Sequence, residues 1–281
     1  MKKVRIVIDS TADVTPDVKE QLTVVPLTVN FGAEEYIDGV TITHKEFYEK
    51  LVERDVLPTT SQPTPEAFAK VYRQAQEAGE QVVVITVSSK LSGTYQSAAI
   101  AAEDFPGVVY VVDSKNVALA SGILAEFALR LANEGVDAPG IAAALTEERE
   151  NVRLIAMLDT LEYLKKGGRI SKAVAFAGGI LSIKPVVCIQ DGEIIVLGKA
   201  RGSKQGNNLL IKEIEAAGGV DFTKPLLLGY TGLSDALLRK YIQDSAFLWE
   251  GNVTELPTTI VGSVVGTHAG PGAVAVAFFK K

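Results

Sequence analysis

The sequence predicts an α/β protein of two domains, the first built on a parallel sheet and the second an α+β domain with a mixed sheet. Residues 4–8, 82–87 and 108–112 are short and almost entirely apolar, as strands buried on both faces of a parallel sheet are. Helical patterns alternate with these strands, which is typical of α/β architecture. In the second half, residues 184–189 and 193–197 flank Gln190-Asp191-Gly192, a hairpin turn signal that predicts antiparallel pairing.

Two helices of the first half have clear start signals. Thr43 and Glu46 have the spacing of a capping box, in which each side chain bonds the other residue's backbone N–H. Thr64 precedes Pro65, and proline is tolerated at the first position of a helix. We expect two further helices, over residues 91–102 and 117–134.

The second half predicts the remaining elements of a mixed sheet and its helices. Further strands are expected over residues 226–231, 253–256 and 273–279, and helices over residues 209–217 and 234–247. We place the domain boundary near Asp159, so that the domains span residues 1–158 and 159–281.

Composition excludes several classes of partner. The 281 residues carry a net charge of -6, which argues against sequence-independent binding to nucleic acid or to anionic lipid headgroups. A membrane span needs about 20 apolar residues, and no stretch of the sequence approaches that length. One cysteine permits no intrachain disulfide and fits a reducing compartment. We therefore expect a cytoplasmic protein without stable membrane insertion.

Known cofactor and metal motifs are missing or lack their context. The sequence has no Gly-x-x-x-x-Gly-Lys-Ser/Thr loop for a nucleotide. Residues 270–275 match Gly-x-Gly-x-x-Ala, but a strand pattern follows at once where a dinucleotide site needs a helix. His44, His268 and Cys188 are the only soft metal ligands, which is too few for a structural zinc site. We predict neither a cofactor nor a metal.

Two segments are dense in hydroxyl groups. Thr59, Thr60 and Ser61 lie in a segment bounded by prolines, and a second segment, from Ser88 to Thr94, follows a predicted strand. In an open α/β sheet, ligands bind beyond the carboxyl ends of the strands, and a helix start there favours an anion. The alternative is that these hydroxyls only cap helices. The residues alone leave the two readings about even.

Two loops are basic although the chain is acidic. Arg169 lies in a Lys-Lys-Gly-Gly-Arg turn. Two interpretations are open: the turn contacts an anion or a partner through Arg169, or it ends a helix whose lysines complement the helix dipole. Arg201 lies in a second basic cluster, for which a solvated loop is the alternative. Between them, residues 173–181 are small and apolar, typical of a core helix but also able to line a tunnel.

The two histidines differ in their surroundings. His268 lies among glycines, which allow close backbone approach, and a histidine can donate a hydrogen bond to a carboxylate. We expect a functional role there. His44 is interpreted as part of a solvated helix start.

An ordered series of motifs resembles the DegV family from end to end. The series comprises Asp9-Ser10-Thr11-Ala12-Asp13, Val25-Pro26-Leu27, Thr59-Thr60-Ser61-Gln62-Pro63, Leu91-Ser92-Gly93-Thr94-Tyr95-Gln96-Ser97, residues 158–170 and Gly266-Thr267-His268-Ala269-Gly270-Pro271-Gly272. These proteins bind fatty acids and include the FakB-type carrier subunit of bacterial fatty acid kinase. The resemblance implies two α/β domains with the lipid between them.

The resemblance also implies roles for individual residues. Thr60 and Ser92 would hydrogen-bond the carboxylate of a long-chain fatty acid, with His268 nearby and Ser61, Gly93 and Thr94 in the same site. Arg169 and Arg201 would face an ATP-dependent kinase subunit that forms the acyl phosphate for phospholipid synthesis. The chain itself would be a monomeric, non-catalytic carrier with the fatty acid as its ligand.

Two alternatives remain open at this point. A hydrolase could use Ser92 and His268, but Ser92 lacks the Gly-x-Ser-x-Gly setting of a nucleophile elbow and no acid is evident as a partner of His268. A lipid sensor that regulates another protein would have the same binding residues as a carrier.

Overall fold

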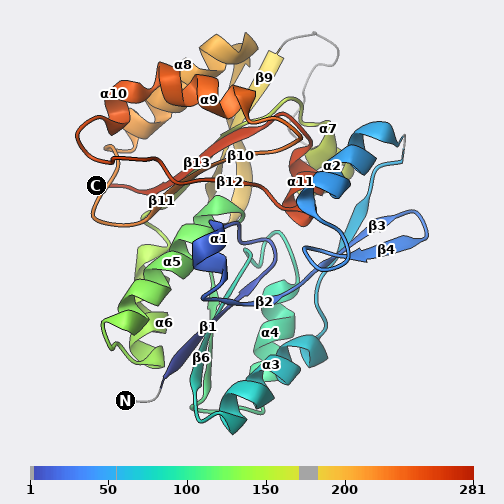
Figure 1. Cartoon of the computed structure of the whole chain (residues 1–281), viewed down its shortest axis with the longest axis vertical. Coiled ribbons are helices and arrows are strands. Elements are labelled where there is room, and N and C mark those ends of the chain that lie inside the picture. The colour runs from blue at the N-terminus through green and yellow to red at the C-terminus, as the bar shows by residue number, and fades with distance from the viewer. Residues whose placement is uncertain (1–2, 55, 171–182) are drawn as a thin grey trace.

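A computed structural model describes residues 3–54, 56–170 and 183–281 of the chain (Figure 1). Its N-terminal part holds a four-stranded parallel sheet in the order β2-β1-β6-β7. The strands are β1 (Val4–Asp9), β2 (Thr23–Val25), β6 (Gln81–Thr86) and β7 (Val109–Asp113), and the short helix α1 (Pro16–Lys19) joins the first two.

Helices cover both faces of this parallel sheet. On one face, α3 (Pro65–Glu77) and α4 (Thr94–Ala102) enclose a core that includes Phe68 and Tyr72. On the other lie α5 (Leu119–Asn133) and α6 (Ala138–Glu148). The continuous apolar strands of the sequence are therefore explained, because both of their faces are buried.

The second large sheet has six strands and mixed pairing. Its order is β10-β9-β8-β13-β11-β12, antiparallel throughout except that β11 and β12 run parallel. The strands are β8 (Val152–Met157), β9 (Ile183–Gln190), β10 (Glu193–Arg201), β11 (Leu226–Tyr230), β12 (Thr258–Ile260) and β13 (Val274–Phe279). On its outer face pack α8 (Gly202–Ala216), α9 (Ala236–Asp244) and α10 (Ala246–Trp249) (Figure 1).

Helix α5 joins the two sheets into one body. In Figure 1 it lies between the parallel sheet and the six-stranded sheet. Its buried residues Ile123 and Leu124 belong to one apolar cluster with Ile8 of β1, Leu154 of β8 and Phe279 of β13. Because the inner faces of both sheets share this cluster, burial of apolar surface holds them together.

A third, smaller sheet stands beside both and was not predicted. It has the order β4-β3-β5, from β3 (Thr28–Phe31), β4 (Glu34–Ile37) and β5 (Thr59–Ser61). Helices α2 (His44–Glu53) and α11 (Ser263–Ala269) share its apolar cluster, and α7 (Glu162–Lys166) contacts α11. This arrangement brings Thr60, from the first half of the chain, beside His268 near its C-terminal end.

Most predicted elements are confirmed, with four differences. The first is at residues 91–93, which form a turn, so that α4 begins at Thr94. The second is α8, which begins at Gly202 instead of residue 209. The third is the predicted helix 234–247, which is divided into α9 and α10 at Ser245. Last, residues 253–256 form no strand; the edge strand is β12, a few residues later.

The predicted hairpin is present, with Asp191 and Gly192 between β9 and β10, both at positive φ (51° and 82°). This backbone geometry favours the right-handed twist of the strands and explains the Asp-Gly pair. Strand β8, which precedes the predicted boundary after residue 158, pairs with β9 and β13. Among the described residues, no helix is long and apolar enough to cross a membrane.

The capping box of α2 gives a stability prediction. The Thr43 hydroxyl accepts from the Glu46 N–H at 3.2 Å, while Glu46 accepts from the Thr43 N–H at 2.8 Å. We expect Thr43→Ala to lower the free energy of unfolding by about 1 kcal/mol in urea titrations, since the Glu46 N–H loses its acceptor.

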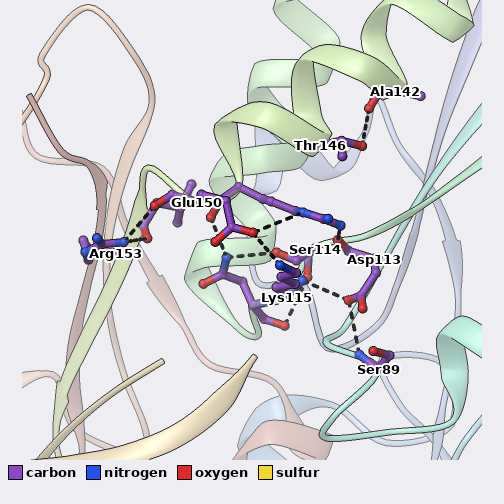
Figure 2. Close-up of polar contacts among 11 residues, drawn as sticks. Ser89, Asp113, Ser114, Lys115, Ala142, Thr146, Glu150 and Arg153 are labelled. Carbon is purple, nitrogen blue, oxygen red and sulfur yellow. Dashed lines mark hydrogen bonds and ion pairs between the residues drawn. The ribbon is translucent and has the colours of Figure 1, made fainter. Parts of the chain in front are cut away.

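Thr146→Ala is the matched control. Thr146 is an exposed residue inside α6 whose hydroxyl donates to the Ala142 carbonyl (Figure 2). Alanine has the higher helix propensity, so this change should leave stability unchanged or slightly raised. Equal losses in the two variants would contradict a specific role for the cap.

Candidate functional site

An apolar cavity lies where the carboxyl ends of β1, β6 and β7 meet one face of the six-stranded sheet. Thr11, Val87 and Val117 follow those three strands and line it. Apolar side chains from the sheet, α7 and α11 supply most of the remaining wall, including Leu154, Leu158, Leu164, Val187, Ile189, Ile194, Val261, Val264 and Val265. Such a wall suits a long apolar ligand and offers it few polar partners.

The polar lining includes four residues predicted from the sequence. Thr60, Ser92, Arg169 and His268 all line the same cavity, although they come from β5, the loop before α4, the turn after α7 and α11. Thr60 and His268 are in direct contact, with 3.0 Å between Oγ1 and Nε2. The structure therefore brings together the segments that the sequence singled out separately.

Thr94 supports Ser92 from behind. Thr94 is fully buried, and its Oγ1 lies 2.8 Å from the Ser92 Oγ, which also accepts from the Thr94 N–H at 3.3 Å. If the Thr94 hydroxyl donates, Ser92 has both acceptor positions filled and its own proton left to give. Ser92 can then donate to a carboxylate, a group that only accepts.

Gln62 connects the Thr60 segment to the Ser92 segment. Its side-chain amide donates to the Gly93 carbonyl at 3.3 Å and to the Ser97 hydroxyl at 3.1 Å. A methyl group on Gly93 would lie 2.2 Å from the Gln62 Oε1, so only glycine allows this approach. Gly93 thus has a packing role. Ser61 does not line the cavity: it is exposed, and its hydroxyl accepts from Asn30 at 3.3 Å.

Helix α11 holds His268 in place through its opposite end. Asp13 accepts from the Gly262 N–H at 2.7 Å and Asp38 from the Ser263 N–H at 3.3 Å, while the Tyr48 hydroxyl donates to the Val261 carbonyl at 2.9 Å. Burial raises the pKa of Asp13 well above its usual value. These contacts fix the helix start in the core, so the position of His268 is determined by residues from distant parts of the chain.

The surroundings of His268 keep its ring neutral. Burial, with a smaller contribution from the nearby Arg169 charge, lowers its pKa to about 4. Among the described residues its Nδ1 has no hydrogen-bond partner. No carboxylate therefore orients this ring as in a catalytic triad, and its other nitrogen faces Thr60 instead of Ser92.

The two predicted arginines lie in different settings. Arg169 is half-buried and lines the cavity, and it donates to the Leu91 carbonyl at 3.1 Å and to the Gly167 carbonyl at 2.6 Å. Arg201 is exposed at the end of β10 and does not line this cavity. The small-residue run 173–181, considered as a tunnel wall, lies outside the described residues. His44 is half-buried near Asp38, so its interpretation as a solvated residue was wrong.

A second, polar cavity adjoins the first at Cys188 and Ile189. Several of its charged groups already have partners in the protein: Lys115 pairs with the Glu150 carboxylate at 2.6 Å, and Arg153 donates to the Glu150 backbone carbonyl at 3.0 Å (Figure 2). Arg149 donates to the Asp113 carbonyl at 2.6 Å. This cavity offers a ligand few unused charges.

Sequence reasoning missed some of the polar lining. Thr11, Tyr230 and Thr231 also line the apolar cavity. Thr11 could have been predicted, because it follows β1 in the Asp-Ser-Thr motif. Tyr230 ends β11 and Thr231 follows it, and neither has a distinguishing sequence pattern. Within the described ranges, no group of three or more His, Cys, Asp or Glu side chains is arranged to hold a metal ion.

The fold and the cavity define an α/β protein whose two large sheets close over an apolar cavity with a few polar groups in its wall. The sequence model described as "Uncharacterised protein, DegV family" matches residues 3–281. The chain belongs to the DegV family. DegV domain-containing proteins of Caldanaerobacter subterraneus and Deinococcus radiodurans are 35% and 36% identical to it, over 100% and 98% of this chain and 100% and 97% of theirs.

Solved structures extend this comparison. A fatty-acid-binding DegV family protein from Thermus thermophilus is 36% identical, with a TM-score of 0.88 over 99% of this chain and 100% of that one. DegV of Bacillus subtilis, described as a fatty acid binding protein, is 30% identical, with a TM-score of 0.84 over 100% of both chains. A stearic-acid-binding protein from Eubacterium ventriosum is 28% identical, with a TM-score of 0.85 over 100% and 99%. Fatty acid binding is thus a property of proteins in this family.

The low pKa of His268 predicts how stability depends on pH. The unfolded chain takes up a proton on this histidine as the pH falls through about 6.5, whereas the folded protein takes it up only near pH 4. The neutral His268 ring therefore contributes fully to the free energy of unfolding above pH 6.5, and this contribution is lost as the pH falls toward 4. The loss is about 3 kcal/mol at most, at about 1.4 kcal/mol per pKa unit. Urea titrations at pH 7 and pH 4.5 measure it.

His268→Gln should reduce this loss of stability, because glutamine does not titrate. His44→Gln tests the other histidine, whose pKa burial also lowers. If His268→Gln kept the full pH dependence of the parent protein while His44→Gln removed it, the assignment to His268 would be wrong.

Proposed function

We propose that this protein binds one long-chain fatty acid in the apolar cavity, with the carboxylate held by Thr60 and Ser92, and presents it to an ATP-dependent kinase for acyl-phosphate formation. The observation that carries the binding step is the placement of Thr60, Ser92 and His268 on one otherwise mostly apolar cavity. The fatty acids bound by the Thermus thermophilus and Eubacterium ventriosum relatives support the ligand class.

Burial of the tail is the main contribution that favours this binding. A chain of about 14 methylene groups gains on the order of 11 kcal/mol when fully buried, at about 0.8 kcal/mol per group. Association costs about 4–15 kcal/mol. The tail thus supplies the affinity, and the hydroxyls are needed mainly to orient the carboxylate.

Two neutral hydroxyls suit a carboxylate that must later react. Each can donate one hydrogen bond and leave the negative charge on the oxygens, whereas a bidentate arginine would hold the group more strongly. A carboxylate oriented in this way keeps its nucleophilicity toward a phosphoryl group, while the partner supplies ATP and metal. Arg201 is exposed and therefore accessible to such a partner.

The alternatives differ in what the same site would do. A lipid sensor would use the identical cavity, and acyl-phosphate formation with a kinase separates the two roles. An acyl hydrolase is less well supported, since His268 contacts Thr60 and no acidic group among the described residues bonds its Nδ1.

The ligand itself is the first test. Protein purified from a bacterial host should carry about one long-chain fatty acid per chain, because the apolar cavity favours an occupant over water. Native mass spectrometry followed by lipid extraction measures this. Protein that is free of ligand and takes up neither palmitate nor oleate would refute the proposal.

The carboxylate contacts are the second test. Thr60→Ala and Ser92→Ala should each weaken oleate binding by roughly 1–3 kcal/mol, the range for a lost hydrogen bond to a charged group. The double variant should lose less than the sum, because both groups bind the same carboxylate. Thr59→Ala is the control, since Thr59 is exposed on the same strand. Full affinity in the double variant would remove both residues from the site.

The partner contact is the third test. Arg201→Ala should leave oleate affinity unchanged and reduce acyl-phosphate formation with the kinase at least tenfold. The reason is that an exposed charge in the contact with a partner raises the rate of association with that partner. Arg239→Ala, which changes an exposed arginine of α9, should affect neither quantity. Loss of lipid in step with activity in Arg201→Ala would place this arginine in the lipid site instead.

A further inference from the structure

The turn after α7 lies directly against the ring of His268. A methyl group built on Gly167 would lie 2.2 Å from the His268 Nδ1 and 2.8 Å from its Cε1. Real carbon atoms do not approach so closely, so any side chain at position 167 would displace the ring. The backbone does not itself require glycine there, because Gly167 has a φ of -74°. The contact with the ring is what excludes a larger residue.

Arg169 fastens this turn in the position that produces the contact. Its guanidinium donates to the Gly167 carbonyl at 2.6 Å and to the Leu91 carbonyl at 3.1 Å, while the Gly167 N–H donates to the Tyr163 carbonyl at 2.8 Å. Gly167 is thus tied both to its own helix and to the loop that carries Ser92. The carbon surface of Gly167 is held against one nitrogen of the ring.

The other nitrogen of the ring has a partner. The His268 Nε2 lies 3.0 Å from the Thr60 Oγ1. A neutral imidazole carries one proton, and the nitrogen that lacks it can only accept. The ring is neutral at pH 7, since burial lowers its pKa to about 4. The direction of the Thr60–His268 hydrogen bond therefore depends on which nitrogen is protonated.

The contact with Gly167 favours one of the two tautomers. With the proton on Nδ1, a buried N–H would point at carbon and find no acceptor among the described residues. With the proton on Nε2, that N–H donates to Thr60, and only a lone pair faces Gly167. Buried N–H donors without partners are rarer in proteins than buried acceptors without partners.

We propose that Gly167 is a positioning residue that holds His268 as the tautomer protonated on Nε2, so that Thr60 accepts from the ring and donates its own proton to the ligand. The last step rests on the proposed function, because a carboxylate requires a donor. Thr60 would then act as Ser92 would with the Thr94 hydroxyl as donor: each hydroxyl would accept from a protein group behind it and donate into the cavity.

Nitrogen NMR of the unmodified full chain tests the tautomer directly. The chain has two histidines, so ¹⁵N-histidine labelling gives two spin systems, and His44→Gln assigns them. At pH 7, with and without oleate, the His268 Nε2 should be protonated and its Nδ1 bare. A proton on Nδ1, or on both nitrogens, would overturn the proposal.

Gly167→Ala tests the positioning role. The added methyl group should displace the ring, alter the tautomer signature and weaken oleate binding about tenfold, the effect of one misaligned hydrogen bond to a charged group. Gly168→Ala is the control within the same turn: Gly168 has a φ of 69° and nothing within 4 Å of the added carbon. That variant strains the backbone but should keep the parent tautomer. An unchanged tautomer and affinity in Gly167→Ala would remove Gly167 from this role.

His268→Gln gives a measurement that does not depend on whether Gly167→Ala folds. The glutamine amide can place a donor near the position of Nε2, so this variant should retain more oleate affinity than His268→Ala. Equal losses would contradict the donor role. If the unmodified protein bound no fatty acid but showed the Nε2 tautomer, the proposed function would fail and the positioning role would stand.

Discussion

The hydrogen bond between Thr60 and His268 is the contact on which the site depends. It joins residues 208 positions apart, one on the small three-stranded sheet and one near the end of α11. Both residues line a cavity whose wall is otherwise mostly apolar. A polar pair placed at such a wall gives an amphipathic ligand one orientation, because a charged head group costs several kcal/mol wherever it finds no donor.

Several layers of structure serve this one contact. The buried cluster around α5 fixes the parallel sheet against the six-stranded sheet, and thereby fixes the cavity between strand ends and sheet face. Asp13 and Asp38 hold the start of α11, and Gln62 ties the Thr60 segment to the loop of Ser92. The glycines at 93 and 167 permit the approaches that these bonds need. Small residues in the motifs thus act by allowing contact between larger ones.

The sequence predicts the parallel sheet and most of the helices, because continuous β-branched runs and capping signals are local properties. It also predicts Thr60, Ser92 and His268, through motif density and resemblance. The three-stranded sheet escapes prediction, since β3 and β5 are only four and three residues long and carry polar side chains. Side chains alternate along a strand, so Ser61 points away from the cavity that Thr60 lines, and this follows only once β5 is known. The sequence groups Thr94 with the ligand-binding residues. Its burial behind Ser92 depends on tertiary packing, which a local motif does not show.

A crystal structure of the protein with oleate would show directly whether Thr60 and Ser92 hold the carboxylate. We expect the tail inside the apolar cavity and the two carboxylate oxygens about 2.5–3.0 Å from the hydroxyls of Thr60 and Ser92, the range for O–H donors. We also expect His268 to contact the ligand only through Thr60. A carboxylate at the opposite end of the cavity, or one bound by Arg169 with both hydroxyls unused, would show that these two residues do not hold it.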